Sequence, residues 1–238
     1  DYMTATGTAL DLSEWQLAYF TYQQPVDPLS LTKGDGVVAQ YEEDGEVRPL
    51  GSYDYYYTGC NPWLSMFNYA KGIGGGLEET AVFDDLLDQI DEEDSDKRAY
   101  LNEAKSYLNN TYRLTATDIV SVSTQQELLK QMIMQHGAGT ISYYASPEYY
   151  NYELFNYYSG MEDCRANHAV SVVGWDDNYP KEYFDEEPEH DGAWLIKNSY
   201  GEQWGNDGYF WMSYDEGSIQ DGVAVFYSVD ANRYDNVY

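Results

Sequence analysis

The amino-acid sequence predicts an α+β protein with two lobes, the first mainly helical and the second rich in β-strands. Most helical patterns precede residue 111, whereas β-branched and alternating segments dominate from 112 onward. Hydrophobic residues make up 43% and aromatic residues 17% of the 238 residues, which excludes a disordered chain. We therefore expect a helical left lobe at 1–111 and a β-barrel-like right lobe at 112–238, with a cleft between them.

Four candidate helices lie in the first part. Ser13 is suited to cap the first helix, Pro62 fits the first turn of the second, and Gly72 would end it. The segment 25–51 between these two helices is rich in Gly, Pro and Asp and is predicted to be irregular. The helices are predicted at residues 12–22, 62–71, 78–87 and 97–108.

The second part contains six candidate strands with one helix, 124–136, among them. A helical block followed by a block of strands is the order expected of an α+β protein. The strands are predicted at residues 112–122, 139–144, 169–175, 193–197, 208–214 and 222–229.

The chain is strongly acidic, with 42 Asp and Glu against 12 Lys and Arg and a formal charge of -30. This charge repels phosphate backbones and anionic lipids, so we expect no nucleic-acid and no membrane partner. No apolar run reaches the roughly 18 residues that a membrane span needs. The acidic runs at 84–96 and 185–191 have two interpretations, as solvated loops or as a surface that attracts basic substrates.

Of the three histidines, only His168 has a context that suggests catalysis. It follows Asn167 and begins an apolar segment, so a strand would hold the imidazole on a rigid support. Such support suits a base that must come within about 3 Å of a nucleophile. A structural or surface histidine is the alternative that this segment alone leaves open.

Asn198 follows the apolar segment 193–197 and precedes closely spaced glycines and Trp204. An asparagine in this position can direct its side-chain oxygen at an imidazole N–H. It would then orient the base of a nucleophile–base–orienter triad. The alternative interpretation is a glycine-rich hairpin in which Trp204 is core packing.

Several sequence elements together resemble the papain family of cysteine peptidases, in its bacterial type. They occur in the family's order and cover almost the whole chain. The elements are Leu12-Ser13-Glu14 with Gln16-Leu17, Gly59-Cys60-Asn61, Gly74-Gly75-Gly76-Leu77, His168-Ala169-Val170, and Lys197-Asn198-Ser199 with Trp204-Gly205-x-x-Gly208-Tyr209.

The resemblance implies a papain-like fold and peptide-bond hydrolysis by a Cys-His-Asn triad. His168 would be the general base and the ion-pair partner of a thiolate, and Asn198 its orienter. Tyr200, where the family usually has Trp, and Trp204 would support the site. The chemistry requires neither a cofactor nor a metal. The implied substrate-binding residues are Gly59, Asn61, Trp63 and Asn167.

The family's nucleophile has no counterpart in this sequence. Its Gln-x-x-x-Cys-Gly-x-Cys-Trp type segment is absent, and in the family that segment precedes the Leu-Ser-Glu element, which here begins at Leu12. Cys60 is an in-chain alternative, although the family usually bridges the cysteine at this position. Cys164, four residues before His168, is expected to be a free thiol.

We therefore expect the cysteine on an N-terminal light chain that pairs with this chain, whose start at Asp1 suggests a processed product. The expected protein is a secreted or cell-surface thiol protease, a bacterial heterodimer acting on peptides or proteins. The acidic run at 185–191 lies between the histidine and asparagine segments and would favour basic substrates if it faced the cleft. The alternative function is a non-catalytic papain-like binding module or an inactive fragment.

Overall fold

The computed structural model describes residues 7, 10–22, 40–43, 46–49, 62–70, 75–77, 112–162 and 164–231. The chain forms two compact units, one built mainly from 116–228 and the other from 8–115 together with 229–238. The predicted helices at 78–87 and 97–108 lie outside the described residues. Among the helices that are described, none is long and apolar enough to cross a membrane.

The two described helices of the first part confirm the sequence prediction. They are α2, Glu14–Tyr22, and α3, Pro62–Ala70. Ser13 caps α2 as expected, because its Oγ accepts a hydrogen bond of 3.2 Å from the backbone N–H three residues later. The two helices meet through buried polar side chains, where Asn68 Nδ2 donates to Thr21 Oγ1 at 2.5 Å.

Two glycines connect the start of α2 to the strand that begins at Tyr112. The Gly76 carbonyl accepts a bond of 3.0 Å from the Ser13 N–H, and the Gly75 carbonyl accepts one of 3.1 Å from the Tyr112 N–H. A Cβ on Gly76 would lie 2.2 Å from Oε1 of the buried Gln16, so a larger residue there would displace this side chain. A backbone hydrogen bond therefore joins the Leu-Ser-Glu element to the Gly-Gly-Leu element.

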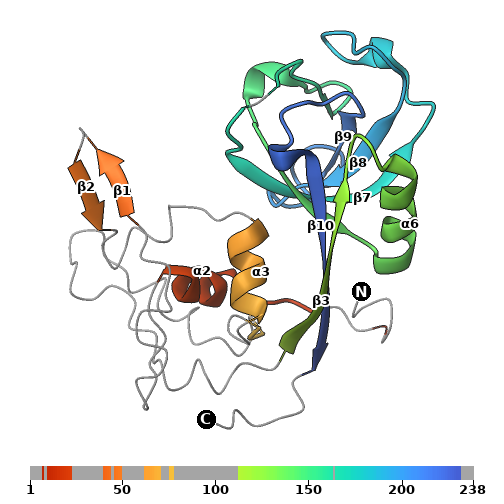
Figure 1. Ribbon diagram of the computed structural model, residues 1–238. Helices are drawn as coiled ribbons and strands as arrows, with labels where there is room; N and C mark the ends of the chain where they lie inside the picture. The colour runs from red at the N-terminus through yellow and green to blue at the C-terminus, as the bar shows by residue number, and fades with distance from the viewer. Residues whose placement is uncertain are drawn as a thin grey trace, which may run out of the picture. The chain divides into compact units, whose positions relative to one another are not determined.

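One eight-stranded sheet dominates the second part (Figure 1). Its strand order is β3-β10-β4-β7-β8-β9-β6-β5. The predicted helix is α6, Gln126–His136, which packs against β4 and β7. All six predicted strands are present, and two short strands, β5 and β6, are additional. The eight strands of the sheet are β3 Tyr112–Ser121, β4 Gly139–Tyr143, β5 Tyr150–Asn151, β6 Asn156–Tyr157, β7 His168–Asp176, β8 Ala193–Lys197, β9 Tyr209–Ser213 and β10 Val223–Ala231.

The structure adds short elements that the sequence patterns did not predict. Strands β1, Gln40–Glu43, and β2, Glu46–Pro49, pair antiparallel inside the segment expected to be irregular. They were missed because four-residue strands rich in charge carry no alternating apolar pattern. Short β5 and β6 were missed in the same way. Within the described ranges, 3₁₀ turns also occur at Pro147–Tyr149, Lys181–Tyr183 and Gln220–Gly222.

The two faces of the sheet differ in character. Because side chains alternate along a strand, β7 places Val170 and Val172 in the core and turns Ala169 and Ser171 outward. Strands β4, β8 and β9 and helix α6 complete this core with buried apolar side chains. These are Leu129, Ile133, Ile141, Tyr143, Trp194, Ile196, Phe210 and Met212.

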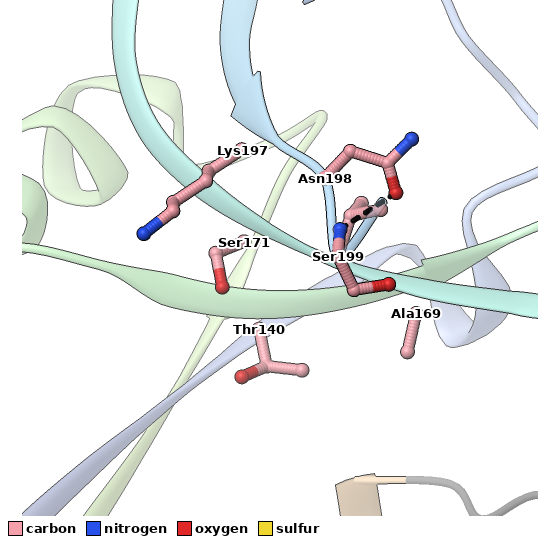
Figure 2. Close-up of a pocket in the computed structure, with 7 residues that line it drawn as sticks. Thr140, Ala169, Ser171, Lys197, Asn198 and Ser199 are labelled. Carbon is pink, nitrogen blue, oxygen red and sulfur yellow. Dashed lines mark hydrogen bonds between the residues drawn. The ribbon is translucent and has the colours of Figure 1, made fainter. Parts of the chain in front are cut away.

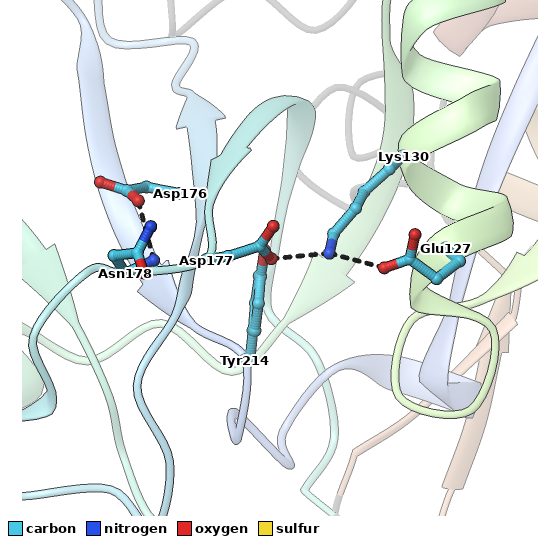
Figure 3. A network of polar contacts seen from close by, with 6 residues as sticks. All are labelled: Glu127, Lys130, Asp176, Asp177, Asn178 and Tyr214. Atoms are coloured by element: carbon cyan, nitrogen blue, oxygen red, sulfur yellow. Dashed lines mark hydrogen bonds and ion pairs between the residues drawn. The ribbon is translucent and has the colours of Figure 1, made fainter.

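A buried lysine joins α6 to the turn that follows β7 (Figure 3). Lys130 is only 7% exposed, and its Nζ donates to Asp177 Oδ1 at 2.6 Å and to Glu127 Oε1 at 2.9 Å. The Tyr214 hydroxyl donates to the same Asp177 oxygen at 2.8 Å. The hydrogen bond from Lys130, with that from Tyr214, holds the pKa of Asp177 below its usual range.

Replacing this ammonium should destabilise the fold at neutral pH. Lys130→Met keeps the buried stem but removes both charged hydrogen bonds, so we expect the free energy of unfolding to fall by about 1 kcal/mol in urea titrations. A lowered carboxyl pKa stabilises the fold above the unfolded pKa and ceases to do so as the pH falls through the acid range. The difference between wild type and Lys130→Met should therefore shrink below about pH 4.

The matched control is Lys181→Met, which removes the ammonium of a pair with Glu187 at the surface. It should change the urea midpoint much less. An equal loss in the two variants, or a Lys130→Met effect that grows at low pH, would contradict the assignment of this stability to the Lys130–Asp177 bond.

Candidate active site

The two polar residues singled out in the sequence meet at one end of the sheet. His168 is the first residue of β7, and Asn198 follows the last residue of the neighbouring antiparallel strand β8. The start of one strand and the end of its antiparallel neighbour lie side by side. His168 Nε2 and Asn198 Oδ1 are 2.9 Å apart, and the asparagine is 5% exposed. The structure thus joins two side chains separated by 30 positions.

The orientation of the Asn198 amide is fixed by its neighbour. The Ser199 N–H donates to the same Oδ1 at 2.8 Å, so the oxygen and not the NH₂ group must face this corner (Figure 2). An oxygen can only accept, and so Nε2 of His168 carries the proton in this hydrogen bond. The lone pair of the neutral imidazole is therefore on Nδ1. This is the tautomer needed to take a proton from a nucleophile at Nδ1.

The glycine-rich loop after Asn198 holds the asparagine backbone. The Asn198 N–H donates to the Gly208 carbonyl at 2.9 Å, and the Gly208 N–H donates to the Trp204 carbonyl at 2.7 Å. Gly205 has φ +64°, and a Cβ there would lie 2.6 Å from the Tyr209 carbonyl oxygen. Glycine is required at 205 for this tight turn. The loop is thus a hairpin connection, as one interpretation proposed, and it also positions Asn198.

Aromatic rings surround the imidazole. Tyr200 stacks on His168 with ring centres 5.0 Å apart and an interplanar angle of 23°, and Trp204 packs edge-on against Tyr200 at 5.5 Å. Tyr143, which faces His168 in the register of β4 and β7, lies 5.9 Å away. The rings limit rotation of the imidazole and cover part of its surroundings.

The tyrosines behind the histidine are neutral. The hydroxyls of Tyr143 and Tyr150 are hydrogen bonded to each other, and Tyr157 donates its hydroxyl proton to the Tyr144 carbonyl. Burial raises the pKa of Tyr143, Tyr150 and Tyr157 above the usual range, so none is an anion at physiological pH. The structure shows three hydrogen-bonded tyrosine hydroxyls here that sequence patterns did not single out.

The side chain of Asn167 has a structural partner. Its Oδ1 accepts from the Ala145 N–H at 2.7 Å and its Nδ2 donates to the Ala145 carbonyl at 3.0 Å. This pair continues the ladder between β4 and β7 beyond His168 and fixes the backbone beside the imidazole. Both amide atoms are engaged, and the Asn167 N–H donates to the Tyr143 carbonyl at 3.1 Å, so the backbone carbonyl is the group left for the substrate contact predicted from the sequence.

A pocket of about 270 Å³ lies beside Asn198 on the outward face of β4, β7 and β8 (Figure 2). Thr140, Ser171 and Lys197 are register partners on these three strands, so their side chains share this face. The remaining lining residues are Ala169, Val170, Asn198 and Ser199. This face is therefore formed by small and hydroxyl side chains together with one lysine.

The remaining predicted residues lie elsewhere in the chain. Trp63 lies on α3, in the other compact unit, and Gly59, Cys60 and Asn61 fall outside the described residues. Cys164 is a free, half-buried thiol, as expected, with its Sγ 3.6 Å from the Glu162 carbonyl oxygen.

The acidic run at 185–191 lies in the loop that joins β7 to β8 at the end of these strands opposite His168, so it does not border the imidazole. Because β7 and β8 are antiparallel, their connection leaves at Asp176 and returns at Ala193, at the end of the pair opposite His168. Several of its carboxylates have partners in the described structure. Asp185 accepts from Asn151 Nδ2 at 2.8 Å, Glu187 pairs with Lys181 at 3.0 Å, and Asp191 accepts from the Lys181 N–H at 3.1 Å. The preference for basic substrates stays a prediction.

Comparison with protein families places this cluster in context. Residues 60–227 match the family described as papain family cysteine protease. The chain belongs to this family. Digestive cysteine proteinase 3 of Homarus americanus is 28% identical over 168 residues, which cover 68% of this chain and 44% of that protein. Testin-2 of Rattus norvegicus is 27% identical over 171 residues, covering 67% of this chain and 46% of that protein. The chain spans about half the length of these relatives.

Solved structures confirm the papain-like fold. The cysteine protease and lectin-like domains of Cwp84, a surface layer associated protein of Clostridium difficile, match with a TM-score of 0.68 and 24% identity, over 98% of this chain and 45% of that one. Cwp84 carrying C116A, after propeptide cleavage, matches with a TM-score of 0.67, 24% identity and coverage of 97% and 50%. Both similarities establish the fold of this chain.

Proposed function

We propose that this chain supplies the base and the orienting group of a cysteine peptidase that hydrolyses peptide bonds by a Cys-His-Asn mechanism. The observation that carries the proposal is the bond between His168 Nε2 and Asn198 Oδ1, fixed by the Ser199 N–H and covered by Tyr200. These contacts leave Nδ1 to meet a thiol, as such a mechanism requires. Membership of the papain family supports the same chemistry.

In this mechanism Nδ1 of His168 takes the proton of the thiol and forms a thiolate–imidazolium pair. The thiolate attacks the scissile carbonyl, and the imidazolium returns the proton to the leaving amine as the C–N bond breaks. Water then attacks the acyl-enzyme thioester with His168 as base, releasing the acid and regenerating the thiol. Asn198 holds the ring in one orientation through all of these steps.

The nucleophilic cysteine is proposed to lie on a segment outside residues 1–238, carried by an N-terminal light chain. The outward face beside Asn198 is suited to receive that segment, because its residues are small and a backbone can approach closely. Lys197 on this face favours a segment with a polar or acidic contact surface.

The substrates are proposed to be peptides or proteins, and the protein is proposed to act at the cell surface or after secretion from a bacterium. The name of one structural relative supports this location, since Cwp84 is a surface layer associated protein.

Peptide hydrolysis by the complete protein tests the proposed function. Using the protein as isolated with its light chain, we expect cleavage of a peptide library that iodoacetamide abolishes, because alkylation removes the thiolate. Hydrolysis that survives full alkylation of cysteines would contradict a cysteine mechanism. Peptide binding without any cleavage would favour the alternative, a non-catalytic papain-like binding module.

The heterodimer is tested separately by mass spectrometry under native and denaturing conditions. A smaller polypeptide should accompany the 238-residue chain in the native spectrum and separate from it on denaturation, or on reduction if a disulfide links the two. An active species with the mass of this chain alone would exclude the light chain.

A further inference from the structure

A rigid turn near the candidate site presents two apolar side chains to solvent. Asn151 Oδ1 accepts hydrogen bonds of 2.9 Å from the N–H groups of both Glu153 and Leu154, which closes the turn between β5 and β6. The Asn151 amide nitrogen is in turn bound to Asp185 at 2.8 Å. These bonds fix the turn from both sides.

The exposure of this turn needs an explanation. Tyr152 is 55% exposed and Leu154 is 46% exposed, although each is large and apolar. Neighbouring apolar side chains that a fixed backbone holds in water commonly mark a contact surface. The backbone at Phe155, with φ 51°, adds a strained residue to the same turn.

A chain of aromatic contacts leads from this turn to the imidazole. Starting at Tyr200, which stacks on His168, the successive partners are Trp204 at 5.5 Å, Tyr150 at 5.7 Å and Tyr152 at 5.8 Å between ring centres. Trp204 and Tyr150 are half-buried. We call these four residues, Tyr200, Trp204, Tyr150 and Tyr152, the aromatic strip.

The ring on which the strip begins suggests its occupant. In the proposed mechanism the His168 imidazolium gives its proton to the leaving amine, so the residues after the cleaved bond depart on the imidazole side. The strip begins on the ring that covers this imidazole. An extended peptide advances roughly 3.3 Å per residue. Roughly the third to fifth residue after the cleaved bond would therefore reach Tyr152.

We infer that Tyr152, at the far end of the aromatic strip, and Leu154, in the same turn, bind an apolar or aromatic side chain on the leaving side of a peptide substrate. The inference rests on the proposed function and adds to it a preference at positions distant from the cleaved bond. Contact between aromatic rings at this surface favours Phe, Tyr or Trp over small polar residues.

The test compares three substrates on the complete protein. Two are internally quenched peptides that differ only by Phe or Ser at the third to fifth positions after the cleaved bond, and the third is a peptide arylamide with no amino acid after it. For wild type we expect the Phe peptide to have a kcat/KM about five- to tenfold above that of the Ser peptide. Tyr152→Ala should remove this preference, while the Ser peptide and the arylamide are cleaved as before.

Two further variants separate recognition from folding. Tyr152→Phe keeps the ring and should keep the preference. Tyr183→Ala removes a tyrosine that is 46% exposed and not part of the strip, and should also keep it. An unchanged preference in Tyr152→Ala, or an equal loss on all three substrates, overturns the inference while leaving the proposed function in place. If wild type cleaves none of the substrates, the proposed function fails and the inference fails with it.

Discussion

His168→Ala should lower kcat/KM for peptide hydrolysis by on the order of 10³-fold or more. The variant loses the imidazolium that stabilises the thiolate and the proton donor for the leaving amine. No other described side chain stacks beneath Tyr200 or bonds to Asn198 Oδ1 as His168 does. Progress curves on a fluorogenic peptide, recorded with the complete protein, measure the loss directly.

His190→Ala is the matched control for this variant. His190 lies in the loop between β7 and β8, is 67% exposed at its side chain, and bonds through Nδ1 to Asp215 at 3.1 Å. Its removal should leave kcat/KM within about twofold of wild type. Near wild-type activity in His168→Ala, or equal losses in the two variants, would show that His168 is not the base.

Asn198→Ala should also impair catalysis, but less severely, by on the order of 10- to 10²-fold in kcat. The substitution removes the acceptor of the Nε2 proton and leaves the imidazole in place between Tyr200 and Tyr143. The base then spends part of its time in the wrong orientation or tautomer. KM should change little, because the side chain is 5% exposed.

Asn198→Asp provides a sharper comparison, since it keeps an oxygen acceptor for both His168 Nε2 and the Ser199 N–H. It should recover a large part of the activity lost in Asn198→Ala. A loss in Asn198→Ala as large as that of His168→Ala, with no recovery in Asn198→Asp, would contradict an orienting role. Thermal unfolding of each variant distinguishes this result from a folding defect.

The parts of the fold that follow from local patterns were predictable from the sequence. The strands carry β-branched residues with two-residue alternation, as at Val170 and Val172, and α2 begins at the Ser13 cap. The meeting of His168 with Asn198 was anticipated because each stands at the end of an apolar strand and the two segments match family motifs. The structure supplies the geometry of that contact.

The surroundings of the site depended on tertiary register, which local patterns do not contain. Tyr143 faces His168 only because β4 pairs with β7 in that register, and Asn167 finds Ala145 for the same reason. The position of the acidic run shows the same limit. Its place in the chain between the two motif segments suggested proximity, whereas antiparallel pairing sends the connecting loop to the opposite end of the strands.

The central claim is that this chain provides the base and orienter while the nucleophile comes from another segment. Identifying the cysteine that reacts during inactivation tests this claim most directly. The complete protein is treated with limiting iodoacetamide until activity is lost, and the alkylated cysteine is located by peptide mass mapping. We expect the loss of activity to parallel alkylation of a cysteine outside residues 1–238. Alkylation of that cysteine should be slower in His168→Ala, because the thiolate loses its partner. Inactivation that tracks alkylation of Cys60 or Cys164 would contradict the account.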